Sequence, residues 1–542
     1  MIELRGSVVE TTTDHKMPYY RFIVKLTTIF FIGFTSDFTA GQQDRPCEPR
    51  KFGESVVCVC NSTYCDDVIR LPPEPGTYVS YTSSLAGLRF KKDKGTLEQV
   101  DEDTSMFEFA GIKDKLTEPK IELDCAKKYQ KIEGFGGSVT DSAAINWMNL
   151  KEPCLKENLI NSFFGKNGLE YNMIRTPIGG SDFSTREYSY NEIPENDTLL
   201  RNFTLAIEDF DSKIPMMKEA IAAATDEIHI VSSVWSPPVW MKNSHEYSGF
   251  SLLIEEYFQT YAEYYVKYIE AYAAENITIW GITTGNEPLT SVMGGRFNSL
   301  GWTTELMGKW ISQNLGPTIR KSKYRNVKIL AVDDQRPTIL IWFNKMVQEH
   351  PEAEKYIDGI AVHWYLDKIT PPSILKHTAE TYPDKFLIGT EACSGANPTD
   401  VMKVALGSWK RAVDYAKDII EDLQNEPSNL CLDSQGGPNW AKNYVDATVI
   451  VFHEDEEFVK QPMYYAMGHF AKFLPRNSVR IDATNTGLIG IDYVAFETPG
   501  KTYVVVLYNG ALDQTVKIRI DGREAIVELP AESIVTVELN SI

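Results

Sequence analysis

The 542-residue chain has little positive charge. Its 54 Lys and Arg residues are outnumbered by 75 Asp and Glu residues, which gives a formal net charge of −21. Proteins that bind nucleic acid normally carry a basic patch and have a high isoelectric point. The composition therefore argues against a nucleic-acid partner. An acidic surface is compatible with an acidic compartment, where partial protonation of carboxylates eases their mutual repulsion.

Long apolar runs are also scarce. After residue 40 no segment is long and apolar enough to span a bilayer, which takes about 20 residues. Before it, a basic stretch, the apolar run "LTTIFFIGF" and small residues near Ala40 follow one another. This order is typical of a secretory signal peptide, which we expect at residues 1–40. Translation starts at Met1 or at Met17. The alternative to a signal peptide is a single membrane anchor.

Cysteine is sparse, and half of it lies in one short segment without a histidine. The clustered residues are Cys47, Cys58, Cys60 and Cys65. In a secreted chain such a cluster predicts two local disulfides, with a zinc site as the alternative. Four glycosylation sequons fit the same route. They begin at Asn61, Asn196, Asn202 and Asn276.

Short strand-like segments split by turn residues occur at both ends of the chain. Examples are "TYVSYTSS" near the start and "KTYVVVLYNG", "QTVKIRID" and "SIVTVELN" near the end. They predict one β-sandwich built from residues 76–125 and 476–542. The Cys-rich segment 41–75 predicts a small disulfide-bonded β module, which we expect to be completed by about 431–460.

The middle of the chain alternates apolar strands with helical patterns. Seven strand candidates are present, at 131–141, 170–180, 227–235, 277–288, 327–336, 357–365 and 385–393. Their apolar runs are continuous, as expected for strands that are buried on both faces. We therefore predict the α/β class and a (β/α)8 TIM barrel over residues 126–430 and 461–475.

Functional residues of such barrels gather at the carboxyl ends of the strands. The predicted strand ends carry Asp141, Arg175, Trp235, Asn286, Glu287, Asp333, Asp334, Arg336, His363, Trp364, Tyr365 and Glu391. Aromatic rings that pack on a pyranose and polar groups that bind its hydroxyls suit a sugar ligand. For His363 a packed, hydrogen-bonded role is expected, and Asp141 could instead cap the helix that follows it.

Two of these residues follow strands whose ends lie opposite each other in a closed eight-strand barrel. Glu287 follows the fourth predicted strand and Glu391 the seventh, so they face each other across the barrel mouth. Retaining glycosidases use two carboxyls about 5 to 5.5 Å apart, one as acid/base and one as nucleophile. Arg175 and the Tyr365 hydroxyl are placed to hold Glu391 ionised, and Asn286 to bind the sugar 2-hydroxyl.

The chain resembles glycoside hydrolase family 30, in particular its glucosylceramide-hydrolysing members, from Arg45 to nearly the C-terminus. The matching strings include "GFGG", "YNMIRTPI", "GSDFS", "TTGNEP", "DDQR", "GIAVHWYLD", "TEAC" and "GGPNW". The resemblance implies that Glu287 is the acid/base and Glu391 the nucleophile. It also implies a glucose-binding role for Asp141, Trp235, Asn286, Phe297, Tyr365 and Asn439.

The resemblance implies more than the catalytic pair. It pairs Cys47 with Cys58 and Cys60 with Cys65. The implied reaction is hydrolysis of glucosylceramide in the lysosome at a lipid membrane surface, aided by a saposin-type activator. No metal or organic cofactor is implied.

The chain departs from the family pattern between residues 423 and 436. Here "QNEPSNLCLDSQGG" replaces a longer eighth strand, and no Trp stands before Trp440. Either the eighth strand is shortened, which changes one pocket wall, or the gene model has lost a piece of an exon. This departure keeps open a folded but inactive relative that binds lipid or a trafficking receptor. A retaining glycosidase of the same family with another β-glycoside substrate is the second alternative.

Overall fold

The computed structural model describes residues 44–100, 119–397, 399–422 and 428–541. The signal peptide predicted at 1–40 lies outside these ranges. Within them, no helix has the length and apolar character that crossing a membrane requires.

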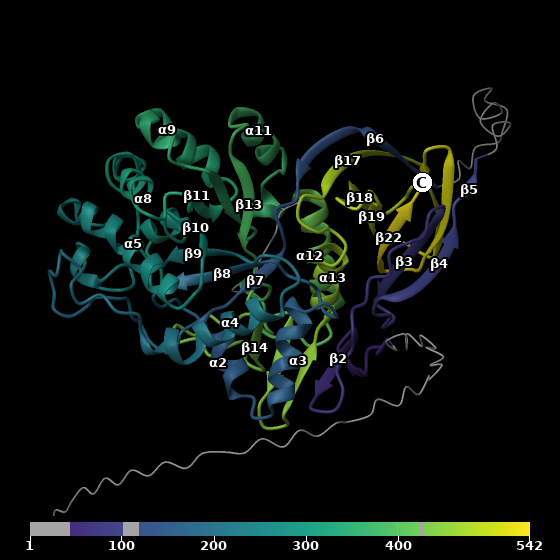
Figure 1. Ribbon diagram of the computed structural model, residues 1–542, viewed down its shortest axis with the longest axis horizontal. Coiled ribbons are helices and arrows are strands. Elements are labelled where there is room, and N and C mark those ends of the chain that lie inside the picture. Colours follow the sequence, from purple (N-terminus) through teal and green to yellow (C-terminus); the bar gives the residue numbers. More distant parts are fainter. Residues whose placement is uncertain (1–43, 101–118, 398, 423–427, 542) are drawn as a thin grey trace, which may run out of the picture. The chain divides into compact units, whose positions relative to one another are not determined.

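A seven-stranded parallel sheet forms the wall of the TIM barrel (Figure 1). All seven predicted strands are present. They are β7 (Gly136–Ser138), β8 (Met173–Ile178), β9 (His229–Val234), β10 (Ile279–Thr283), β11 (Lys328–Gln335), β12 (Gly359–His363) and β13 (Phe386–Glu391). The predicted fold class is thereby confirmed, and the strand residues are almost all buried, as both covered faces require.

Helices separate the strands and pack on the outside of this sheet. The helices are α2 (Asp141–Asn149), α3 (Pro153–Phe164), α4 (Ile214–Ala223), α5 (Phe258–Ala274), α6 (Pro288–Val292), α7 (Thr304–Trp310), α8 (Gly316–Lys321), α9 (Asn344–Glu349), α10 (Pro351–Glu354), α11 (Ser373–Thr381), α12 (Trp409–Asp422) and α13 (Pro462–Ala471). Thr140 caps α2 by accepting from the Ala143 amide, so the cap is not Asp141.

The eighth strand position is reduced to a single bridge. Ser138 of β7 pairs in parallel with Asn429, through its amide to the Ser428 carbonyl at 2.7 Å and its carbonyl to the Leu430 amide at 3.2 Å. The chain then leaves the barrel as β14 (Cys431–Asp433), which pairs in another sheet. Residues 423–427 of the expected departure lie outside the described residues, so the shortened eighth strand stays a prediction.

A cavity of about 860 Å³ lies between the segment before β7 and the start of β13. Its wall includes Phe135 before β7, Met173 at the start of β8, and 386–388 of β13. These are the strand beginnings, so the opening lies at the amino-terminal end of the barrel wall. The carboxyl ends, where the predicted functional residues lie, are at the opposite end of the barrel.

The Cys-rich module is a five-stranded sheet made from two distant segments. Its order is β1-β2-β16-β15-β14. The strands not yet defined are β1 (Pro49–Phe52), β2 (Ser55–Asn61), β15 (Val449–Phe452) and β16 (Glu457–Lys460). Disulfides join Cys47 to Cys58 and Cys60 to Cys65, the pairing that the family resemblance implied.

The β-sandwich draws on both ends of the chain, as Figure 1 shows by the purple and blue strands beside the yellow ones. Ten strands follow the order β4-β3-β22-β19-β18-β17-β6-β20-β21-β5. They are β3 (Thr77–Ser84), β4 (Lys91–Thr96), β5 (Glu98–Gln99), β6 (Lys120–Lys131), β17 (Val479–Thr486), β18 (Ile491–Glu497), β19 (Tyr503–Asn509), β20 (Gln514–Ile520), β21 (Arg523–Leu529) and β22 (Ser533–Asn540). Val505, Val516 and Val535 lie in the core between its two layers.

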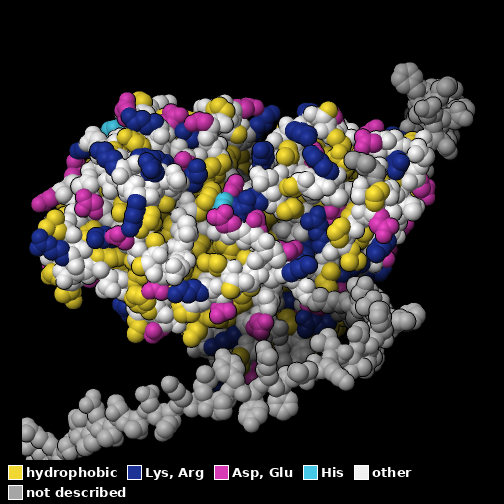
Figure 2. Space-filling view, viewed as in Figure 1, with side chains coloured by type: hydrophobic (Ala, Val, Ile, Leu, Met, Phe, Trp, Pro, Cys, Tyr) yellow, Lys and Arg dark blue, Asp and Glu magenta, His cyan; other side chains and the backbone are white. Residues whose placement is uncertain are grey.

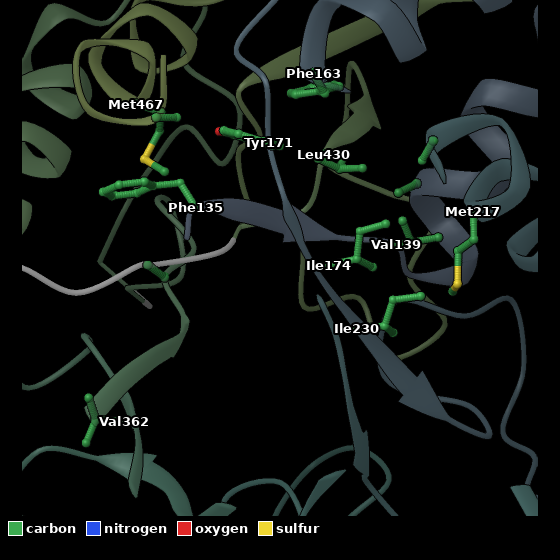
Figure 3. Close-up of a cluster of buried hydrophobic side chains, with 14 of the residues drawn as sticks. Phe135, Val139, Phe163, Tyr171, Ile174, Met217, Ile230, Val362, Leu430 and Met467 are labelled. Atoms are coloured by element: carbon green, nitrogen blue, oxygen red, sulfur yellow. The ribbon is translucent and has the colours of Figure 1, made fainter. Parts of the chain in front are cut away.

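The barrel wall and its helices share one apolar core. In Figure 3, Ile174 of β8 and Ile230 of β9 lie beside Val139 and point toward Met217 of α4. All four side chains are at most 1 % exposed. Burying each of them contributes about 1.5 to 3 kcal/mol relative to exposure, and this packing holds β8 and β9 against α4.

Candidate active site

The carboxyl ends of the barrel strands bring the predicted residues together. Arg175 lies within β8, Trp235 follows β9, Asn286 and Glu287 follow β10, and Glu391 ends β13. A carboxylate oxygen of Glu287, a ring nitrogen of His363 and a carboxylate oxygen of Glu391 all lie within 4.8 Å of one another. The two carboxyls therefore have the close spacing of a retaining pair rather than the wider spacing of an inverting one.

Both oxygens of Glu391 accept charged or polar hydrogen bonds. Arg175 Nη1 donates to Oε2 at 2.6 Å, and the Tyr365 hydroxyl donates to Oε1 at 2.8 Å. The Glu391 side chain remains 19 % exposed. A carboxyl group that is held in place by two donors and is still partly exposed suits a nucleophile.

Glu287 has a different environment. Its residue is 8 % exposed, and its Oε1 contacts Gln335 Nε2 at 2.9 Å and His363 Nδ1 at 3.2 Å. Its backbone φ of 46° lies in the left-handed region, which is uncommon for a residue other than glycine. The Glu287 amide donates to the Asp333 carbonyl at 2.8 Å, and this bond helps to hold the unusual backbone.

Asp333 is the buried centre of the network beneath both carboxylates. Its side chain accepts from Arg175 Nη2, the Ser233 hydroxyl and the Thr390 hydroxyl, and it contacts His363 Nε2 at 3.1 Å. Burial alone would raise the pKa of Asp333. The Arg175 charge and these hydrogen bonds outweigh burial and hold the pKa below its usual range.

His363 connects this centre to Glu287. Burial would lower its pKa, but the negative charge of Glu391 and the contacts with Asp333 and Glu287 raise it to about 10. The imidazole is therefore a buried cation between the side chains of Asp333 and Glu287. The expected packed and hydrogen-bonded histidine is present, and its position shows that it also orients the site.

Of the residues predicted to bind glucose, Asn286 and Trp235 contact Arg175, whereas Phe297 and Asn439 lie in other segments. Asn286 Oδ1 accepts from Arg175 Nη2 at 2.7 Å, and the Trp235 ring lies 4.7 Å from the Arg175 guanidinium carbon. Phe297 is half-buried in the loop between α6 and α7. Asn439 lies beyond β14 and donates from Nδ2 to Asp182 Oδ2 at 3.3 Å.

Asp141 belongs to a separate buried ion pair. Its carboxylate accepts from the Tyr188 hydroxyl at 2.9 Å and lies 3.2 Å from Lys213 Nζ, which also pairs with Asp209. These contacts give Asp141 a structural role at the start of α2. Its predicted contact with glucose stays a prediction.

Asp182 and Gln335 are two site residues that the sequence did not single out; Asp182 is buried beside Glu391. It is 4 % exposed and accepts from Asn439 and Asn443. Burial and the negative charge of nearby Glu391 raise its pKa to about 7. The signal was present in the string "GSDFS", but Asp182 follows β8 by four residues and so was not among the strand-end residues.

The remaining predicted positions lie on the surface or near it. Asn196, Asn202 and Asn276 are exposed, and Asn61 is half-buried at the end of β2. Glycosylation at these four sequons stays a prediction.

The Cys393 thiol, two residues beyond Glu391, is buried, and burial with the charge of Glu391 raises its pKa to about 12, which makes it inert.

A parallel barrel with two carboxyls this close at its strand ends is the arrangement of a glycoside hydrolase. The chain belongs to glycosyl hydrolase family 30. The family's TIM-barrel domain matches residues 132–474, and its β-sandwich domain matches residues 477–537.

Known relatives agree with this assignment. The lysosomal acid glucosylceramidase of Mus musculus is 37% identical over 494 residues, which cover 89% of this chain and 92% of that protein. An endo-beta1,6-glucanase structure has a TM-score of 0.72 at 26% identity, covering 85% of this chain and 99% of the other. The structure of SrfJ from Salmonella typhimurium has a TM-score of 0.76 at 21% identity, with 85% and 99% covered, and shares the fold.

Proposed function

We propose that the protein is a retaining β-glucosidase that hydrolyses glucosylceramide to glucose and ceramide. The observation that carries the proposal is the pair Glu287 and Glu391, with carboxylate oxygens within 4.8 Å and different surroundings. Glu391 is held by Arg175 and Tyr365, whereas Glu287 is held by Gln335 and His363.

The proposed reaction has two displacements. In the first, a Glu391 oxygen bonds to the anomeric carbon, the bond from that carbon to the ceramide oxygen breaks, and Glu287 gives its proton to that oxygen. In the second, Glu287 takes a proton from water, the water oxygen bonds to the anomeric carbon, and the bond to Glu391 breaks. Asn286 is placed to bind the 2-hydroxyl in both steps.

The substrate assignment is supported by the 37% identity to a mouse protein named for glucosylceramide hydrolysis. The same relative supports a lysosomal location, reached by the secretory route through the predicted signal peptide. A saposin-type activator is part of the proposal on the same ground.

A lipid surface as partner is supported by exposed apolar side chains on the loops after the strands. Ile193, Phe250, Met293, Ile369 and Val401 are between 56% and 98% exposed, and they follow β8, β9, β10, β12 and β13. Loops after the strands surround the site, so apolar tips there bring a membrane-borne substrate to it. Charged side chains of both signs are interspersed on the face shown in Figure 2, so a net charge of −21 does not make the surface uniformly acidic.

The test is hydrolysis of glucosylceramide by the purified protein near about pH 5 with anionic lipid, beside the variant Glu391→Gln. We expect turnover in the parent, the β-anomer of glucose as first product, and a loss of about 10⁴-fold or more in a variant that still folds. An α-anomer as first product, or normal turnover by Glu391→Gln, would contradict the mechanism. Parallel assays on β-1,6-glucan and xylosides separate glucosylceramide from other family substrates, and a folded parent inactive on all of them would be a binding protein.

A further inference from the structure

The end of strand β11 is irregular in a way that bears on Glu287. The pairing of β11 with β12 shifts register between Val332 and Asp334. Val332 and Asp333 have φ values of 77° and 47°, in the region that residues with a Cβ avoid, and a β-branched residue there is rarest. Such a bulge re-aims the side chains that follow it. Here it turns Asp333 toward Arg175 and brings Gln335 to Glu287.

The bulge holds Glu287 at two places. The Asp333 carbonyl accepts from the Glu287 amide at 2.8 Å, and Gln335 Nε2 donates to Glu287 Oε1 at 2.9 Å. The backbone of Gln335 is also held, because its backbone N–H donates to Asp334 Oδ1 at 2.7 Å, and the residue is only 8 % exposed. Backbone and carboxyl of Glu287 thus rest on the same three-residue irregularity.

These contacts distinguish the two oxygens of Glu287. Oε1 contacts both the Gln335 amide and the His363 ring nitrogen. An oxygen that accepts two hydrogen bonds is the poorer place for a proton, so the proton that a general acid needs would sit on Oε2. We propose that Gln335 is a positioning residue, which presents Oε2 of Glu287 as the oxygen that gives and takes the proton. This inference rests on the proposed function.

The chemistry of the side chain fits this role. A general acid must keep its proton until the leaving oxygen takes it. A Lys or Arg at position 335 would add a positive charge and favour the ionised form of Glu287. A neutral amide orients the carboxyl without that charge. The cation that is present, His363, is balanced by Asp333 on its other nitrogen.

The test uses the substitution Gln335→Met, which keeps the length of the side chain and removes the donor. A series of β-glucosides with leaving groups from dinitrophenol to simple alcohols measures the need for proton donation. We expect kcat/KM to fall about tenfold or more for alkyl glucosides and glucosylceramide. For dinitrophenyl glucoside we expect a loss of less than about threefold, since that leaving group departs without a proton.

The matched control is Gln461→Met. Gln461 is also a buried amide, 1 % exposed, and its Nε2 donates to the Asp446 side chain and to the Ala447 carbonyl. We expect this variant to lower stability while losing activity equally on all leaving groups. Equal losses across the series in Gln335→Met would overturn the positioning role.

A second variant, Gln335→Glu, tests the same contact if Gln335→Met does not fold. A carboxyl against Glu287 favours the protonated acid, so we expect the alkaline limb of the pH–rate profile to move up by about one pH unit. An unmoved limb would overturn the inference. A parent that turns over no glucoside would instead refute the proposed function, and the inference with it.

Discussion

Asp182 gives the protein a pH-dependent term in its stability that one substitution should remove. The carboxyl is 4 % exposed, and burial and the charge of Glu391 raise its pKa to about 7 against hydrogen bonds from Asn443 and Asn439. In the unfolded chain the pKa of an Asp is about 3.9. The variant Asp182→Asn keeps the shape and the acceptor for both asparagines but has no proton to bind.

The sign follows from which state binds the proton more tightly. Because the folded pKa of Asp182 is the higher one, its contribution to the free energy of unfolding is fully present below about pH 3.9 and is lost as the pH rises through about 7. The whole shift corresponds to roughly 4 kcal/mol, of which about 2 kcal/mol is lost between about pH 5 and about pH 7. Asp182→Asn lacks this loss, so it should gain on the parent by about 2 kcal/mol over that interval.

Urea unfolding followed by tryptophan fluorescence at a series of pH values measures the difference between parent and variant. Glu391→Gln serves as control, because removing the Glu391 charge lowers the pKa of Asp182 and moves the transition to lower pH. A stability difference between parent and Asp182→Asn that is constant from about pH 5 to about pH 7 would refute the reasoning.

Three further outcomes follow from the described contacts. Arg175→Met leaves buried Asp333 without its charged partner and should cost about 3 to 5 kcal/mol in the free energy of unfolding, measured by urea titration; a loss below about 1 kcal/mol contradicts it. Gly136→Ala should prevent recovery of folded protein, since a Cβ there would lie 1.9 Å from the Met173 carbonyl oxygen; a normal circular dichroism spectrum and yield contradict it. Under native conditions iodoacetamide should modify exposed Cys154 and spare buried Cys393, as peptide mass spectrometry will show, and modified Cys393 would contradict its burial.

The barrel strands were predictable because burial on both faces leaves a mark on the local sequence. The stretches 329–332 of β11 and 359–362 of β12 contain no polar side chain, and each ends where a polar residue appears. The rule that chemistry lies at the carboxyl ends then selected Arg175, Tyr365 and Glu391, which the structure joins by direct hydrogen bonds.

What the sequence did not indicate depends on contacts between distant segments. Gln335 reaches Glu287 only because β11 carries a bulge, and a register shift has no signature in one strand's composition. Asp182 lies in the loop after β8. Its partner Asn439 is 257 residues further along the chain. Asp182 lies beyond its strand end, whereas at the end of β11 the charged neighbours of Gln335 were selected and the neutral amide was not.

The shortened eighth strand affects the wall of the site more than its chemistry. The side-chain hydrogen bonds to the carboxyls of Glu287 and Glu391 come from Arg175 in β8, Gln335 at the end of β11, His363 in β12 and Tyr365 just after β12. None of those hydrogen bonds uses residues 428–430, where the Asn429 side chain instead contacts Thr140 and Cys393. A rim that lacks one aromatic wall loses ground-state and transition-state binding alike, which raises KM. Proton transfer and nucleophilic attack depend on the strands that remain, so the cost of the missing strand should appear in KM before it appears in kcat.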